Sequence, residues 1–321
     1  MARTLMLRGM VPFRLKLASW LVLVAASVAG LPCAAATPAR AVWIWEADSY
    51  GMLENEATAS EAITFLRREG FDTAYLYADA WRGRNLIASD PAAYRALIAA
   101  MHRRGVKVHA LLGSWYLGTH AYVLPGRRAD ALAMVDRVLA YNATAAANER
   151  FDGISLDIEP HVLDAWDVRR DELLANFLDL SAALRDRVQA SPRPVPLGAA
   201  IPFWLDGIQL EWRGRRDAVS AHAIGLYDYV AIMDYRNRAD GGDGIVSHAE
   251  TEMAQAAVVG HQVVIGLEVA PNELAKITFD GLRPADLARE MAATTRAFAT
   301  APAFAGFAIH HYGAYRRWVM R

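Results

Sequence analysis

Strand-like and helix-like segments alternate along almost the whole of this chain, and this alternation constrains its fold more than any other feature. The predicted strands span residues 41–46, 71–79, 106–113, 152–159, 195–204, 229–236, 262–269 and 306–312. The predicted helices span residues 58–69, 91–104, 129–149, 170–189, 218–224, 247–259 and 284–298. Eight strands with crossover helices predict an α/β fold, a single (β/α)8 TIM barrel.

A doubly wound open sheet is the main competing architecture. Such a sheet usually carries a Gly-x-Gly-x-x-Gly phosphate loop after its first strand, and none follows residues 41–46. No Pro/Ser/Gly-rich linker, low-complexity tract or repeat divides residues 37–321, so we expect one domain there. The barrel is therefore favoured, and nothing in the sequence points to a cofactor.

Composition limits the partners of the chain. Hydrophobic residues make up 54% of it, charged residues 21%, and the net charge is -1. This balance gives no electrostatic preference for nucleic acid or for an anionic membrane. We expect a monomer with no nucleic-acid partner and no membrane span in the mature chain.

The first residues have the order of a secretory signal peptide. Basic residues (Arg3, Arg8, Arg14 and Lys16) precede an apolar run over 17–30, and the small residues 34–36 follow. A membrane anchor is the weaker alternative, because the run is shorter than the ~20 residues that span a bilayer. The only cysteine, Cys33, lies inside this segment, and Pro32 before it fits a lipoprotein signal poorly. We expect cleavage near Ala36 and a secreted or periplasmic bacterial protein without disulfides.

The segment from Phe151 to Pro160 carries the strongest chemical signal. Side chains alternate along a strand, so Asp157 and Glu159 share one face with Ser155, while the intervening apolar residues share the other. Two acids two residues apart lie roughly 7 Å apart along a strand, which is close enough for each to affect the ionisation of the other. Such a pair can supply a general acid near neutral pH, although a solvated strand end is the simpler alternative.

This segment resembles the Asp-Gly-x-Asp-x-Asp-x-Glu motif of glycoside hydrolase family 18, the chitinase-type family. Asp152, Gly153, Asp157 and Glu159 match the motif, and Ser155 stands where the middle Asp is expected. In that family the Glu protonates the glycosidic oxygen, and the preceding Asp orients the substrate's 2-acetamido group, which attacks the anomeric carbon. The resemblance implies these roles for Glu159 and Asp157, and a site role for Asp152.

Two other strands can be compared with the same family. Its sixth strand commonly reads Met-x-Tyr-Asp, and here Met233 and Tyr235 are kept while Arg236 replaces the Asp. The resemblance implies that Tyr235 contacts the acetamido group. The last strand of the family usually presents a Trp beneath the reacting sugar, and here His310 takes that place. The resemblance therefore implies a rebuilt sugar pocket.

The barrel hypothesis also predicts where further binding residues lie. Active sites of TIM barrels form at the carboxyl ends of the strands. Several predicted strands end in aromatic or acidic residues: Trp45-Glu46, Ser114-Trp115-Tyr116, Phe203-Trp204, Asp234-Tyr235, Glu268 and His310-His311. From these we expect Trp45, Trp115, Trp204, Asp234, Glu268 and His310 to bind substrate together with Asp152. Aromatic faces beside acids suit a sugar ring, so an oligosaccharide or polysaccharide is the expected substrate.

Two alternatives remain at this point. Glu268 after the seventh strand could be the nucleophile of a retaining glycosidase in which Glu159 is the acid/base, if the two carboxyls lie about 5–5.5 Å apart. The barrel could also be a non-catalytic carbohydrate-binding protein, as some relatives of family 18 are. A metal hydrolase is disfavoured, because His310 and His311 point to opposite faces of a strand and no His-Glu-x-x-His helix exists.

Overall fold

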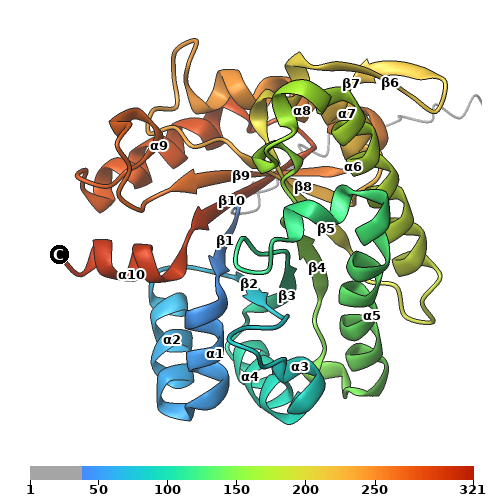
Figure 1. The fold of residues 1–321 in the computed structure, drawn as a ribbon. Helices are drawn as coiled ribbons and strands as arrows, with labels where there is room; N and C mark the ends of the chain where they lie inside the picture. The colour runs from blue at the N-terminus through green and yellow to red at the C-terminus, as the bar shows by residue number, and fades with distance from the viewer. Residues whose placement is uncertain (1–37) are drawn as a thin grey trace, which may run out of the picture. The chain divides into compact units, whose positions relative to one another are not determined.

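The strands pair in parallel and close on themselves. A computed structural model describes residues 38–321, in which eight strands form a closed barrel in the order β1-β10-β9-β8-β5-β4-β3-β2 (Figure 1). The single (β/α)8 TIM barrel expected from the sequence is confirmed. The predicted signal peptide, with Cys33, lies outside the described residues.

The barrel strands lie close to their predicted positions; most are shorter, and β1 and β10 begin and end two residues earlier. They are β1 (Ala39–Ile44), β2 (Thr73–Tyr77), β3 (Lys107–Leu112), β4 (Gly153–Leu156), β5 (Leu197–Pro202), β8 (Tyr229–Met233), β9 (Gln262–Glu268) and β10 (Phe304–His310). Because these strands end early, most of the polar residues assigned to strand ends belong to the loops that leave the barrel.

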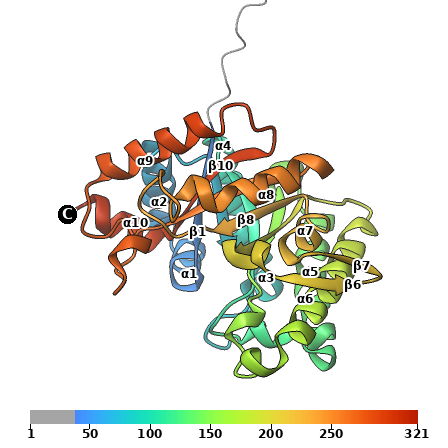
Figure 2. The ribbon, with the colours of Figure 1, turned by 90° about the horizontal axis from the view of Figure 1, so that it is seen from above.

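Helices surround the barrel on its outside (Figures 1 and 2). They are α1 (Glu46–Glu54), α2 (Glu56–Arg68), α3 (Leu86–Ser89), α4 (Pro91–Arg103), α5 (Arg128–Thr144), α6 (Trp166–Gln189), α7 (Val219–Ile224), α8 (Ile245–Val259), α9 (Pro284–Ala297) and α10 (Tyr312–Val319). Local signals explain their ends. At the start of α4, for example, the Asp90 side chain accepts from the backbone N–H of Ala93, and Pro91 occupies the first turn.

Helices α1, α3 and α10 and a two-stranded hairpin were not predicted. Helix α1 follows β1 after a single residue, and its buried face is small because only Ser49, Tyr50 and Met52 are buried. Strands β6 (Gln209–Trp212) and β7 (Arg215–Ala218) form an antiparallel hairpin in a segment expected to be irregular. Its turn uses Arg213 and Gly214, both at positive φ, as tight hairpins require. Helix α10 directly follows the last strand.

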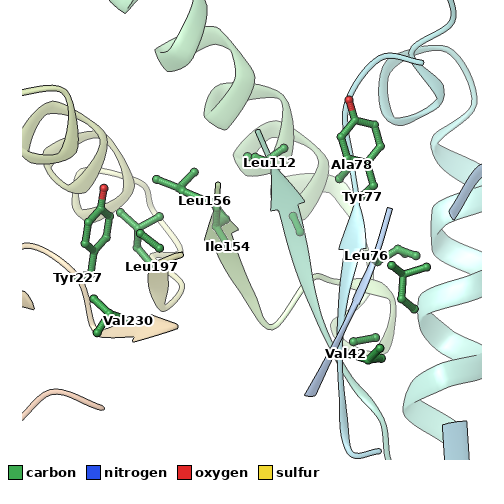
Figure 3. Packing of buried hydrophobic residues seen from close by; sticks show 14 of the residues in the cluster. Val42, Leu76, Tyr77, Ala78, Leu112, Ile154, Leu156, Leu197, Tyr227 and Val230 are labelled. Atoms are coloured by element: carbon green, nitrogen blue, oxygen red, sulfur yellow. The ribbon is translucent and has the colours of Figure 1, made fainter. Parts of the chain in front are cut away.

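Strand alternation divides the core into two layers. Inside the barrel lie the side chains of Trp43, Tyr75, Leu111, Tyr229 and Val264, with smaller neighbours. The intervening residues point outward and pack under the helices (Figure 3), among them Val42, Leu76, Leu112, Ile154, Leu156, Leu197 and Val230. This alternation also decides which polar side chains at the strand ends can face the barrel axis.

No helix within residues 38–321 is long and apolar enough to cross a membrane.

Helix α8 carries a buried acid that takes no part in the cavity described below. Glu252 is 0% exposed, and neither carboxyl oxygen has a hydrogen-bond partner among the described residues. Burial, followed by the nearby charges of Asp206 and Asp234, raises the pKa of Glu252 to about 8. The folded chain therefore keeps this proton at pH values where the unfolded chain has lost it.

This shift predicts a pH-dependent loss of stability. Between the ordinary pKa of 4.5 and about 8, the folded state binds more protons at Glu252 than the unfolded state, so the free energy of unfolding falls as pH rises. Glu252→Gln should remove this slope and raise stability at pH 9 by an amount on the order of a few kcal/mol. Urea unfolding from pH 5 to pH 9 measures it. Exposed Glu250→Gln on the same helix is the control, and equal slopes in both variants would contradict the assignment.

Candidate active site

A cavity opens at the carboxyl ends of the barrel strands. Its volume is about 260 Å³. It is lined by Trp45, Glu46, Ser114, Trp115, Thr119, His120, Asp157, Glu159, Val162 and His310. Five of the residues predicted for the site thus meet in one cavity: Trp45, Trp115, Asp157, Glu159 and His310. None of the lining residues from the described part of the chain is a lysine or arginine, so the cavity wall is acidic and aromatic.

The end of β4 positions the two central acids. Asp157 follows the strand directly, and its backbone N–H donates to the carbonyl of Leu112 over 2.7 Å. Gly113 permits this close approach, because a Cβ at that position would lie 2.1 Å from the carbonyl oxygen of Asp157. Gly113 also has a φ of +107°, which disfavours any other residue. The position of Asp157 therefore depends on a glycine in the neighbouring strand loop.

Asp157 sits in surroundings that favour its protonated form. Burial, then the charges of Glu159 and Glu46, raise the pKa of Asp157 well above its ordinary value. Its Oδ1 atom is buried and has no hydrogen-bond partner within residues 38–321. Because adjacent carboxylates repel each other, the Asp157–Glu159 pair tends to keep one proton, which belongs to the pair rather than to either residue.

Glu46 is a third acid in the cavity, and the sequence did not assign it a role. It opens helix α1, where its Oε1 accepts a hydrogen bond from the Ser114 hydroxyl at the end of β3. Its position at the end of a predicted strand was the only available signal. Ser155, which stands where the family motif has an acid, is fully buried below Asp157, and its hydroxyl has no partner in the described structure. Glu46 thus supplies a carboxylate near Asp157 from another strand.

Glu159 is bonded to a histidine that the sequence also did not single out. The Oε2 atom of Glu159 lies 3.2 Å from Nε2 of His161, and the Glu159 side chain is 29% exposed. The ring of His161 packs edge-on against Trp204, with centroids 5.3 Å apart. Trp204 therefore does not line the cavity but supports the partner of Glu159. The sequence feature that could have identified His161 is the Glu-Pro-His order, which places it two residues after Glu159.

Tyr235 lies beside the cavity among its acids. Its ring centroid is 5.7 Å from that of His310. Burial, followed by the charges of Glu268, Asp157 and Glu159, raises the pKa of Tyr235 well above its ordinary value. The hydroxyl therefore stays protonated and can donate a hydrogen bond at any ordinary pH.

Glu268 and His310 lie side by side on neighbouring strands. They are direct partners in the β9–β10 register, and Nδ1 of His310 lies 2.7 Å from Oε2 of Glu268. The Oε1 atom of Glu268 accepts from the backbone N–H groups of Val269 and Ala270, at 2.7 and 2.6 Å. Both oxygens of Glu268 are thus engaged, and the side chain lies behind His310 rather than in the cavity wall.

Trp115 is the outermost of the aromatic side chains at the cavity. It is 75% exposed and lies 5.3 Å from the ring of His120, measured between centroids. An exposed indole at the edge of a cavity can stack against the apolar face of a sugar ring.

Besides Trp204 and Glu268, two further predicted binding residues do not line the cavity, and both expectations are corrected. Asp152 precedes β4, at the opposite end of the barrel, where its Oδ2 atom accepts from the N–H of Val108 and contacts His102. Asp234 is buried and bonded to His248 at 3.0 Å. Since Tyr235 faces the cavity side, the preceding residue must point outward under α8.

The replacement of Asp by Arg at position 236 also turns out to lie away from the cavity. The guanidinium of Arg236 bonds Asp243 at 2.8 Å and the carbonyl of Tyr235 at 2.9 Å. Its departure from the family pattern therefore adds no positive charge to the cavity wall.

No group of histidine, cysteine or acidic residues within the described range is arranged to hold a metal ion.

Comparisons with known proteins concern the fold. No protein-family model and no curated protein matches the chain. Among solved structures, a chitinase from Chromobacterium violaceum is 14% identical, with 88% of this chain and 98% of that chain covered and a TM-score of 0.47. A family 18 chitinase from Cycas revoluta in complex with (GlcNAc)3 is 12% identical, with 86% and 95% covered and a TM-score of 0.48. A β-glucuronidase from Bacteroides uniformis is 9% identical, with 80% and 28% covered and a TM-score of 0.50. Chitinases of family 18 are thus among the solved barrels that this divergent chain resembles.

Proposed function

We propose that this chain is a glycoside hydrolase that cleaves an N-acetylated glycan by acid catalysis with assistance from the substrate. One observation carries the proposal: Asp157 and Glu159, from the end of one strand, line the same cavity, where burial and the charges of Glu159 and Glu46 raise the pKa of Asp157 well above its ordinary value. Aromatic side chains at the same cavity, Trp45 and Trp115, offer faces for sugar rings.

The proposed reaction begins at Glu159. Its carboxyl group, open to the cavity, donates the proton held by the pair to the glycosidic oxygen, so that the bond to the anomeric carbon breaks. The carbonyl oxygen of the substrate's 2-acetamido group attacks that carbon and forms a cyclic oxazolinium ion. The Glu159 carboxylate then removes a proton from water, which opens the ring with retained configuration.

Asp157 and Tyr235 would act on the acetamido group. The Asp157 carboxyl accepts its N–H, and the Tyr235 hydroxyl, which stays protonated, donates to its carbonyl oxygen. Positive charge develops on the ring in the transition state, and this charge favours the ionised form of Asp157. The interaction is therefore stronger in the transition state than in the ground state, which is the requirement for catalysis.

The alternative double displacement has less support from the geometry. A nucleophile needs a free oxygen directed at the anomeric carbon. In Glu268, one oxygen accepts two backbone N–H groups and the other contacts His310. Glu268 therefore has no free oxygen to direct at the substrate. The Oδ1 atom of Asp157, by contrast, has no partner in the described structure and is free to accept the acetamido N–H.

The acid role of Glu159 predicts a large loss of activity on one substitution. Glu159→Gln keeps the shape of the side chain but has no proton to transfer, so kcat should fall by about 10²–10⁴-fold while the melting temperature changes little. Hydrolysis of N-acetylglucosamine oligomers by liquid chromatography measures this. Glu273→Gln, an exposed glutamate after β9, is the control. Unchanged turnover by Glu159→Gln would exclude the acid role, and a wild type that binds but never cleaves glycans would indicate a non-catalytic barrel.

Export of the protein belongs to the same proposal. The basic, apolar and small-residue order of residues 1–36 supports cleavage near Ala36 and a secreted or periplasmic location in a bacterium. Mass spectrometry of the protein from the periplasm or medium should find a chain that begins near Thr37. A chain that retains Met1 and remains in the cytoplasm would contradict export.

A further inference from the structure

Three side chains from adjacent strands form a continuous hydrogen-bonded chain beside the cavity. The indole N–H of Trp45, which follows β1, donates to Nε2 of His310 over 3.1 Å. The other ring nitrogen of His310, at the end of β10, lies 2.7 Å from the Glu268 carboxylate at the end of β9. Strand β10 pairs with both β1 and β9, so the barrel itself places the three side chains in this order.

The donor and acceptor roles in this chain follow from its first member. An indole nitrogen can only donate, so Nε2 of His310 must accept and carries no proton. The proton of the neutral imidazole therefore lies on Nδ1 and is donated to Oε2 of Glu268. Since Oε1 of Glu268 accepts two backbone N–H groups, both oxygens are acceptors, as in an ionised carboxylate.

The surroundings of His310 leave its ring little freedom. Trp43 packs edge-on at 6.0 Å between centroids, Tyr235 lies at 5.7 Å, and His311 lies at 5.2 Å. Glu268 is only 8% exposed, so the hydrogen-bond partner of the imidazole is shielded from water. The imidazole is thus held on several sides, and it holds the indole of Trp45 in turn.

We propose that Glu268 and His310 are positioning residues that fix the indole of Trp45 as the aromatic wall on which a sugar ring of the substrate rests. Trp45 and His310 line the cavity, whereas Glu268 acts only through His310. The inference rests on the proposed function for the identity of the substrate, but the hydrogen-bonded chain is independent of it.

This role predicts an effect on binding rather than on chemistry. A wall that contacts the sugar equally in ground and transition states changes KM and leaves kcat nearly constant. His310→Leu should loosen Trp45 and raise KM for N-acetylglucosamine oligomers by about 5- to 10-fold, with kcat within about 3-fold. His310→Gln can accept from Trp45 and donate to Glu268 through its amide, so it should restore much of the loss. Trp45→Phe keeps an aromatic face, although a smaller one, but lacks the N–H, and it should resemble His310→Leu.

A spectroscopic measurement tests the hydrogen bonds among Trp45, His310 and Glu268 directly. Nitrogen-15 NMR of histidine-labelled protein at neutral pH should show His310, assigned by its absence in His310→Gln, with Nδ1 protonated and Nε2 unprotonated. In Glu268→Gln the NH2 group of the amide must face either the imidazole N–H or the two backbone N–H groups. The tautomer of His310 with Nδ1 protonated should therefore no longer dominate. His261→Gln, at the opposite end of the barrel before β9, is the control for both measurements.

The outcomes separate this inference from the proposed function. A protonated Nε2 in the wild type, or an unchanged KM in His310→Leu, would overturn the positioning role. Loss of kcat with unchanged KM in Glu268→Gln would also overturn it and assign Glu268 to the chemistry. If the wild type does not cleave the N-acetylglucosamine trimer, its Kd replaces KM in the same comparison. A wild type that neither binds nor cleaves the trimer would reject the proposed function and the sugar-binding part of this inference. The hydrogen bonds among Trp45, His310 and Glu268 would then be tested by the tautomer of His310 alone.

Discussion

The pairing of β1 with β10 is the interaction on which the rest of the site depends. It closes the barrel and joins the first and last strands of the chain, so that Trp45 and His310 meet although they are 265 residues apart in sequence. The direct parallel pairing of β3 with β4 brings the loops after these strands to the same end, where Gly113 lets the backbone of Asp157 approach. Parallel strands present all their carboxyl ends together, which explains how acids from separate loops come to share one cavity.

Repulsion between carboxylates gives that cavity its chemistry. Glu46, Asp157 and Glu159 arrive from two different strand ends, with no lining arginine or lysine in the described part of the chain to neutralise them. Burial and the charges of the other two acids raise the pKa of Asp157 well above its ordinary value, and a proton held at the mouth of a barrel is what an acid-catalysed cleavage requires. Glu268 has the opposite environment, because two backbone N–H groups and the His310 imidazole engage both of its oxygens. The two sets of acids are therefore suited to different tasks.

The periodicity of the sequence was sufficient to predict the barrel and the side chains of β4 that face its axis. Asp157 and Glu159 could be predicted because both the alternation and a family motif marked them. Asp152 and Asp234 were wrong as substrate contacts for physical reasons: one precedes its strand and lies at the other end of the barrel, and the other points outward beside an inward neighbour. The contacts of Glu46 and His161 could not be predicted, because they depend on where α1 begins and on the loop that returns His161 to Glu159.

The nucleophile is the central claim, and one comparison of substrates tests it most directly. The kcat/KM values of two oligosaccharide glycosides that differ only at C2, one with an acetamido group and one with a hydroxyl, report whether the substrate supplies its own nucleophile. The account predicts that the acetamido glycoside is cleaved at least about 10²-fold faster, because a neighbouring nucleophile on the substrate has a high effective concentration. Comparable values for the two, with a sugar ester trapped on Glu268, would contradict it.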